Sequence, residues 1–372
     1  MSWHSQVPRS AVDSSGQTWK IHRVWPDRTV GDYILEVVAP GQAGVRGGVL
    51  CGGAFELLPT DDPGLPSLRA EARRGELVSY RPHLRAVVRT DAGYIKVFPP
   101  GGAIVPAQRC AETELLLAPG TFTAPRVLRN SPDVIVFSVV PGQPLGDLAD
   151  DTAGLSDEEF DRLWERWQGA WTTQVTSSAG HAALAALPVH SPEAEVADLR
   201  RWVNRWLRHY NDIQEAASQR ATLTARAEDV MRNLLRTSPD PLVWAHGDLH
   251  DKQILADGAS PLGLLDFDDT AQAEAALDLA NLDVHLELSA RIPCISPDRY
   301  MAAHTRIIAA AEDLHVSPDR FHAYSDGVWL RLACSPFPNR SARALAVLGE
   351  RAAHIPLTSG YEPAPVQLRK RG

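Results

Sequence analysis

The chain has 372 residues, 44% of them hydrophobic and 22% charged. This is ordinary globular composition, which excludes a disordered or fibrous protein and suffices for one large or two medium-sized domains. The formal net charge is −9 and the one basic run is the terminal Arg369-Lys370-Arg371, so we expect no nucleic-acid partner. No signal-peptide pattern opens the chain, and the longest apolar stretch, residues 134–140, is too short for a membrane span. We therefore expect a soluble, cytoplasmic protein with no membrane partner.

The first 140 residues read as a strand-rich unit. Short segments rich in Val, Ile, Tyr and Trp, bounded by Gly, Pro and Asp, are typical of strands. They lie at residues 17–25, 33–38, 77–80, 84–89, 94–98 and 134–140. One helix is predicted among them, at about residues 107–117. The glycine-rich stretch 41–53 has no Gly-Lys-Ser/Thr after it, so it is no Walker A loop and is interpreted as an ordinary loop.

From Pro141-Gly142 onward the pattern is helical. Two apolar stripes at helical spacing are each rich in aromatic residues. They consist of Phe160, Trp164, Trp167 and Trp171, and of Leu199, Trp202, Trp206, Tyr210 and Ile213. Core packing is favoured over a ligand platform for both. Further helices are predicted at residues 272–290, 297–314 and 318–334, which gives two lobes with a cleft between them.

Two polar segments follow short apolar stretches and carry the chemistry. Residues 244–255 contain Asp248 and Gln253, and residues 264–269 contain Asp266. Carboxylates about twenty residues apart at strand ends can converge on one site, where one orients a hydroxyl nucleophile and an amide or second carboxylate holds a divalent cation. A rival reading is a metal-dependent hydrolase, because His246, Asp248 and His250 alternate like a ligand triplet.

These residues also resemble a known family. His246-Gly-Asp248-x-x-x-x-Gln253, then Leu265-Asp266-Phe-Asp, then Asp278-Leu-Ala, is similar to the catalytic and metal-binding segments of the aminoglycoside phosphotransferase and choline kinase-like family. The resemblance implies an α+β, two-lobed protein-kinase-like fold, with a strand-rich N-terminal lobe and a mainly helical C-terminal lobe.

The N-terminal half contains matching candidates. Lys96 is one of only four lysines and lies within a convincing strand, and Glu112 follows on the predicted helix, with Glu114 as the close alternative. Kinases use such a pair to hold the nucleotide phosphates. Residues 134–142 resemble the strand that enters the interlobe hinge, where backbone groups of Ser138 and Val140 are expected to read the adenine.

The resemblance divides the chain into three parts. Residues 1–76 form an N-terminal extension or cap, rich in strands. Residues 77–140 form the nucleotide-binding lobe, with the hinge at about 136–142. Residues 141–372 form the helical lobe that holds the catalytic loop, the metal site and the acceptor site.

The implied reaction is transfer of the γ-phosphoryl group of ATP to a hydroxyl of an aminoglycoside-like antibiotic, an amino sugar or another small metabolite alcohol. Asp248 would accept or orient the hydroxyl proton, and Asp266 and Gln253 would hold Mg²⁺. Lys96, paired with Glu112, would steady the phosphates.

Supporting roles follow for other members of the motifs. His246 and Asp278 would brace the catalytic loop, and Asp268 would either assist the metal or be structural. Acids in the region 147–161 would attract a cationic or amino-bearing acceptor, or would merely suit a solvated loop and helix start. They are Asp147, Asp150, Asp151, Asp157, Glu158, Glu159 and Asp161.

Two departures from the family pattern keep an alternative open. The family has Asn where this chain has Gln253, and the loop Arg81-Pro82-His83 lacks the glycines that usually cover phosphates. The alternative is a catalytically inactive phosphotransferase-like protein that binds nucleotide or ligand without turnover.

Overall fold

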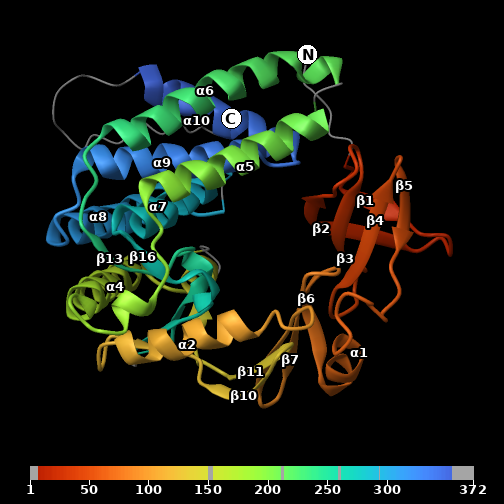
Figure 1. The fold of residues 1–372 in the computed structure, drawn as a ribbon, viewed down its shortest axis with the longest axis horizontal. Coiled ribbons are helices and arrows are strands. Elements are labelled where there is room, and N and C mark those ends of the chain that lie inside the picture. The colour runs from red at the N-terminus through yellow and green to blue at the C-terminus, as the bar shows by residue number, and fades with distance from the viewer. Residues whose placement is uncertain (1–6, 150–153, 211–212, 259–260, 293, 354–372) are drawn as a thin grey trace.

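Apolar and polar residues alternate along the N-terminal strands and build two antiparallel five-stranded sheets (Figure 1). The computed structural model describes residues 7–149, 154–210, 213–258, 261–292 and 294–353. The first sheet runs in chain order through β1 (Ser10–Val12), β2 (Thr18–Pro26), β3 (Tyr33–Val38), β4 (Arg46–Cys51) and β5 (Ala54–Leu57). Its buried face has its own small core around Trp19, Tyr33 and Leu35.

The prediction of a loop over residues 41–53 was wrong for its second half, where β4 and β5 form a hairpin. The glycines there serve close packing. A Cβ on Gly47 would lie 2.6 Å from the Tyr80 ring, and one on Gly48 would lie 2.6 Å from the Phe55 ring. Small residues therefore let β4 approach its neighbours, a use of glycine that composition alone does not separate from a loop.

The second sheet has the strand order β10-β11-β8-β7-β6 and holds Lys96 on its central strand. Its strands are β6 (Glu76–Arg81), β7 (Arg85–Thr90), β8 (Gly93–Val97), β10 (Val127–Ser131) and β11 (Val134–Ser138). Two helices accompany it, α1 (Leu68–Glu71) and α2 (Ile104–Leu116). Because Lys96 pairs with Val87 on one side and Ile135 on the other, its backbone is fixed from both neighbours.

The remainder is mainly helical. Its helices are α3 (Leu145–Leu148), α4 (Asp157–Ser178), α5 (Pro192–Tyr210), α6 (Ala217–Arg236), α7 (Ala276–Arg291), α8 (Pro297–Asp313), α9 (Pro318–Ala333) and α10 (Pro338–Ala353). Its short strands are β9 (Phe122–Thr123), β12 (Gln143–Pro144), β13 (Leu242–Ala245), β14 (Ile254–Ala256), β15 (Leu262–Leu264) and β16 (Ala271–Glu274). Among the described residues, no helix is both long and apolar enough to cross a bilayer.

Helix prediction succeeded where the periodicity was long. The helices expected at 297–314 and 318–334 are α8 and α9, and the aromatic stripe at 160–171 is buried in α4. The helix expected at 272–290 begins later, because residues Ala271–Glu274 form β16, which pairs with β13. Sheet pairing with a distant segment decided that boundary.

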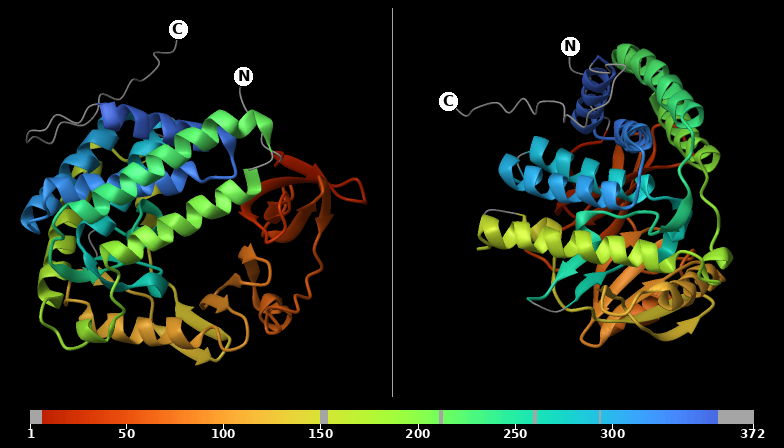
Figure 2. Two further views of the ribbon diagram at one scale, coloured as in Figure 1. Left: turned by 45° about the horizontal axis from the view of Figure 1, so that its top comes forward. Right: turned by 90° about the vertical axis from the view of Figure 1, so that its left-hand side faces the viewer.

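The first sheet reaches from the second sheet to the helical part (Figures 1 and 2). The Tyr33 hydroxyl donates to the Tyr210 hydroxyl at the end of α5, over 3.3 Å. His209 Nε2 lies 2.8 Å from the carbonyl oxygen of Asp27, and Phe337 packs against the core of the first sheet. The sheet is therefore a second connection between the two halves, in addition to the hinge.

We predict that the α4 aromatic stripe is the main stabilising element of the helical part. Trp167 is fully buried between Trp164 and Trp171, with ring centroids 5.4 and 6.0 Å away. Trp167→Ala should lower the free energy of unfolding by about 3–5 kcal/mol, measured by urea titration followed by circular dichroism. Trp202→Ala is the matched control, since Trp202 is 39% exposed, and an equal loss in both variants would contradict the prediction.

Candidate active site

The loop after β13 is held by a buried carboxylate. Asp278, at the start of α7, accepts the backbone N–H groups of His246 (2.6 Å) and Gly247 (2.9 Å). His246 is fully buried, and its Nε2 lies 2.7 Å from the carbonyl oxygen of Leu265. Gly247 has φ +87°, and a Cβ there would lie 2.1 Å from the carbonyl oxygen of Asp269. These contacts hold the loop that carries Asp248 in a fixed position against the second polar segment, residues 264–269.

The same loop has a second brace that the sequence analysis missed. Asn281 Nδ2 donates to the carbonyl oxygen of Leu249 (2.8 Å), and Arg331 from α9 donates to Asn281 Oδ1 (2.6 Å). Asn281 lies three residues after Asp278 and therefore on the same helix face, a spacing that offered a signal. Arg331 comes from a distant helix and offered none.

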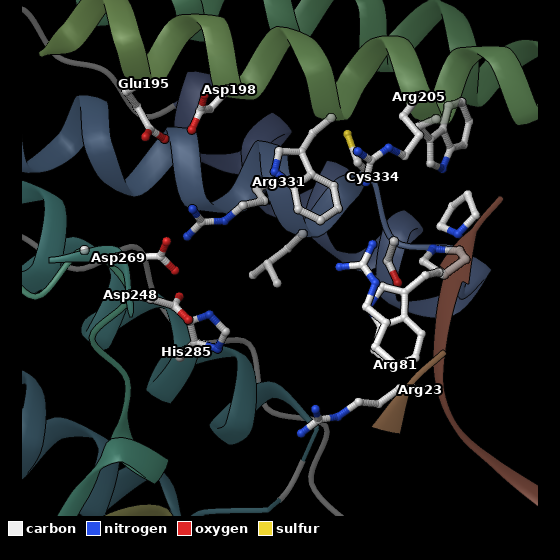
Figure 3. A pocket seen from close by; sticks show the side chains of 18 of the residues that line it. Arg23, Arg81, Glu195, Asp198, Arg205, Asp248, Asp269, His285, Arg331 and Cys334 are labelled. Atoms are coloured by element: carbon white, nitrogen blue, oxygen red, sulfur yellow. The ribbon is translucent and has the colours of Figure 1, made fainter. Parts of the chain in front are cut away.

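The Asp248 side chain points into a cavity between the two halves of the molecule (Figure 3). Burial raises the pKa of this carboxyl above its usual range, although the positive charge of Arg331 opposes the rise. A carboxylate with a raised pKa is a better proton acceptor than an ordinary one.

Asp266 and Gln253 are neighbours through their backbones, because the Leu265 N–H donates to the carbonyl oxygen of Gln253 (3.0 Å). Asp266 adopts a left-handed conformation (φ 67°, ψ 64°), which is uncommon for residues other than glycine and is typical of functional turns. The side-chain oxygen of Gln253 is buried and has no hydrogen-bond partner among the described residues. An orphaned amide oxygen and the carboxylate of a residue close by along the backbone fit a hard cation such as Mg²⁺, which keeps water or phosphate oxygens as its other ligands.

Lys96 joins the two halves at this point. Its Nζ lies 2.5 Å from Asp266 Oδ1 and 2.9 Å from Asp268 Oδ1, and Arg85 donates to Asp268 Oδ2 at 2.9 Å. Burial alone would lower the pKa of Lys96, but the two carboxylates outweigh burial and raise it. The pKa of Asp266 is in turn held below its usual range, because Lys96 and Arg85 outweigh its own burial. Both partners are therefore charged at neutral pH.

The expected Lys96–Glu112 pair is not formed. Glu112 Oε1 instead accepts from Gln108 Nε2 (2.7 Å) on the same helix, and Glu114 is exposed. Helix α2 turns Arg109 toward the aspartate loop, where it donates to the carbonyl oxygen of Asp268. Arg109, one turn before Glu112, is therefore the α2 side chain that contacts the aspartate loop.

Ser138 and Val140 are the two residues whose backbones are expected to contact the adenine. The Ser138 N–H donates to the carbonyl oxygen of Arg126 (2.9 Å), so it is not available to a nucleotide base. Val140 lies just beyond the end of β11 and is buried against Gly263, where a Cβ would lie 2.5 Å from Val140 Cγ1. The carbonyl oxygen of Ser138 and the backbone of Val140 therefore stay as candidates for adenine contacts.

The histidines do not form the ligand triplet of the rival hydrolase reading. Both ring nitrogens of His246 are engaged, Nε2 with Leu265 and Nδ1 with the Asp248 N–H (3.4 Å), and His250 Nδ1 accepts the Lys252 N–H (3.3 Å). Within the described part of the chain, no three His, Cys, Asp or Glu side chains group as a metal site would require.

The cavity has a volume of about 820 Å³ and is walled by both halves of the molecule. Asp248, Asp269 and Arg109 are among the residues that line it. Residues of β2, including Arg23 and Trp25, also line it, together with Arg81 and residues of α5. The N-terminal extension thus contributes directly to the cavity, and no sequence pattern predicts this.

A family model described as "Phosphotransferase enzyme family" matches residues 83–289. The chain belongs to this phosphotransferase family. The predicted family and enzyme class are thereby confirmed. A search of curated proteins finds no significant match.

Solved structures resemble this phosphotransferase in fold. The GDP complex of wild-type aminoglycoside 2'-phosphotransferase-IIIa is 18% identical, with a TM-score of 0.50, covering 77% of this chain and 96% of that one. Choline kinase from Cryptosporidium parvum Iowa II is 10% identical, with a TM-score of 0.49, covering 78% and 92%. Aminoglycoside-3'-phosphotransferase of type VIII is 22% identical, with a TM-score of 0.47, covering 70% and 96%. The family match and the first of these structures, with its TM-score of 0.50, confirm the two-lobed α+β, kinase-like fold.

In this phosphotransferase the turn between β6 and β7 contains no glycine, and the carboxylate of Asp62, from an earlier part of the chain, holds the turn in place. Asp62 is buried and accepts from the Tyr80 hydroxyl (2.8 Å) and from the His83 N–H (2.7 Å), and His83 Nδ1 lies 2.6 Å from it. His83 has φ 64°, so the turn adopts a glycine-like conformation without glycine. The missing glycines are visible in the sequence, but the role of Asp62 is not, because Asp62 lies about twenty residues before the turn.

None of the described acidic residues of the region 147–161 lines the cavity. Asp157 pairs with Arg299 (2.9 Å), Asp161 pairs with Arg306 (2.8 Å), and Glu159 forms a capping box with Ser156 at the start of α4. Asp150 and Asp151 lie outside the described residues. The structural reading of this run, as a helix start, therefore accounts for the members we can place, and its attraction of a cationic acceptor has no support.

We predict that the Asp248 carboxyl titrates above the ordinary aspartate value of 3.8, because burial disfavours its charged form. Carbon-13 NMR of aspartate-labelled protein measures this directly. Arg331→Met should raise the pKa further by removing a positive charge, whereas Arg331→Lys, which keeps the charge, should change it less. A carboxyl that titrates at or below 3.8 in the wild-type protein would contradict the prediction.

Proposed function

We propose that this protein is a small-molecule kinase that transfers the γ-phosphoryl group of ATP to a hydroxyl group of an acceptor bound in the cavity. The observation that carries the proposal is the meeting of Lys96 with Asp266 and Asp268, 170 and 172 residues away along the chain, next to the cavity that Asp248 enters. Phosphoryl transfer requires this combination of fixed positive charge, metal ligands and a hydroxyl-orienting base.

Asp248 is the proposed base. Its carboxylate faces the cavity, and the loop that carries it is braced by Asp278 and Asn281, so an acceptor hydroxyl would meet it in a fixed orientation. Fixed orientation accelerates a reaction by removing the entropy of alignment from the barrier. The raised pKa of Asp248 suits acceptance of the hydroxyl proton at neutral pH.

Asp266 and Gln253 are the proposed ligands of Mg²⁺. When bound, the ion would neutralise charge on the nucleotide phosphates. Gln253 is one methylene longer than the family Asn, yet its side-chain oxygen is buried and has no hydrogen-bond partner among the described residues, and its backbone carbonyl accepts the N–H of Leu265, the residue before Asp266. The substitution therefore keeps an oxygen ligand in place and does not by itself favour an inactive protein.

Lys96 and Arg85 are the proposed phosphate contacts. Their charges are balanced here by Asp266 and Asp268, so the site holds its cations in place before a nucleotide arrives. Preorganised charges of this kind need little rearrangement as charge develops in the transition state. The adenine is proposed to contact the backbone of Ser138 and Val140, next to β11.

The experiment is a thermal-denaturation series with ATP, with and without Mg²⁺. A ligand that binds only the folded state stabilises it by RT ln(1 + [L]/Kd), or about 2.7 kcal/mol at a concentration 100 times the Kd. We expect stabilisation by ATP that depends on Mg²⁺ in the wild-type protein. Asp266→Ala should abolish the Mg²⁺-dependent part, because it removes a proposed metal ligand.

Asp257→Ala is the matched control, because Asp257 is an exposed aspartate nine residues before Asp266. It should behave like the wild-type protein. Asp248→Asn should keep nucleotide binding and lose ADP formation with any acceptor that the wild-type protein phosphorylates. No stabilisation by any nucleoside triphosphate would overturn the proposal.

A further inference from the structure

The cavity has two ends of different charge (Figure 3). Asp248 and Asp269 lie at the catalytic end, and Arg81 and Arg205 lie across the cavity from them. Arg81 ends β6, whereas Arg205 comes from α5, so two separate parts of the chain place a guanidinium group on the same wall.

Most other charges of the cavity wall already have partners. Arg23 lies 3.5 Å from Glu36, Arg109 contacts the Asp268 carbonyl, and Arg331 donates to Asn281. On the acidic side, Glu195 lies 2.8 Å from His190 Nε2, and Asp198 pairs with Arg201. Among the described residues, neither Arg81 nor Arg205 forms an ion pair with a carboxylate.

Each of these two arginines lies over an indole ring. The Arg81 guanidinium carbon is 5.2 Å from the Trp25 ring centroid, and that of Arg205 is 5.3 Å from the Trp202 ring centroid. Stacking engages the face of a guanidinium group and leaves the N–H groups at its edge available, in the fork geometry that suits phosphate and carboxylate oxygens.

The two charges also act on each other. Burial lowers the pKa of Arg81, and the positive charges of Arg205 and Arg85 lower it further. Like charges held together without a counter-charge are unfavourable, and an anion between them removes that penalty.

Arg81 serves the cavity and not the Lys96 cluster. The other end of the same β6–β7 turn carries Arg85, which donates to Asp268 and so belongs to the proposed phosphate site of the nucleotide. Arg81 instead stacks on Trp25, a residue of the first sheet that lines the cavity.

We propose that the acceptor is an anionic hydroxy compound, whose phosphate or carboxylate group binds between Arg81 and Arg205 while its hydroxyl meets Asp248. This inference rests on the proposed kinase function and narrows its substrate class. It replaces the cationic acceptor of the sequence analysis. It also assigns a role in acceptor binding to the first sheet, because Trp25 of β2 orients Arg81.

The test is calorimetric titration of the full-length protein saturated with Mg²⁺ and a non-hydrolysable ATP analogue, which fills the nucleotide's own phosphate site. The probes are a hexose 6-phosphate, a hexonate and the neutral hexose. We expect an anionic probe to bind at least about 10-fold more tightly than the neutral hexose, since hydrogen bonds between charged groups are stronger than those between neutral groups. The two anionic probes separate phosphate from carboxylate as the preferred group.

Arg205→Met should weaken the anionic probe at least about 10-fold and leave affinity for the ATP analogue unchanged, which also reports that the variant is folded. Arg208→Met is the matched control, an exposed arginine one turn further along α5, and should match the wild-type protein. Equal binding of neutral and anionic probes, or no effect of Arg205→Met, would overturn the inference while analogue binding leaves the kinase proposal standing. Failure of the analogue itself to bind would instead count against the kinase proposal.

Discussion

The ion-pair cluster of Lys96 with Asp266 and Asp268 is the interaction on which the rest of the site depends. It joins the central strand of the second sheet to the turn that follows β15, and Lys96 and Asp266 keep each other charged despite burial, because the pKa of Lys96 is raised and that of Asp266 is lowered. A buried lysine without those carboxylates would be unfavourable, and so would the carboxylates without the lysine. The cluster therefore fixes the two lobes relative to each other at the place where the proposed chemistry needs fixed charges.

A second constraint comes from the first sheet, which connects the two lobes on the other side of the cavity. Its contacts with the end of α5, through Tyr33 and His209, place β2 as one wall of the space that Asp248 enters. An acceptor would thus be enclosed by three parts of the chain, and the wall opposite the catalytic loop would select it. Arg81 and Arg205 bring positive charge to the side across from Asp248, although the chain as a whole has a net charge of −9. The overall charge of a protein is a poor guide to the charge of one cavity.

The candidate site could be predicted best where its residues lie close together along the chain. Asp248, Gln253 and Asp266 were found together because spacing within a loop and between adjacent strands limits where side chains can go. The site could be predicted least well where the partner comes from a distant segment. Glu112 was chosen by helix position alone, and the packing of α2 on the aspartate loop brings Arg109 there instead. The sequence does not show that Arg81 and Arg205 line the same side of the cavity. Gly47 and Gly48 resemble loop residues in the sequence, and only the structure shows that the rings of Tyr80 and Phe55 pack closely against them.

The central claim is that Lys96, held by Asp266 and Asp268, is the phosphate contact of a kinase site. Calorimetric titration of wild-type protein and Lys96→Met with the Mg²⁺ complex of a non-hydrolysable ATP analogue, and with adenosine, tests it most directly. The account predicts that Lys96→Met weakens the analogue at least about 10-fold, since a charged hydrogen bond is lost, and leaves adenosine affinity unchanged. Equal affinity of both proteins for the analogue would contradict it.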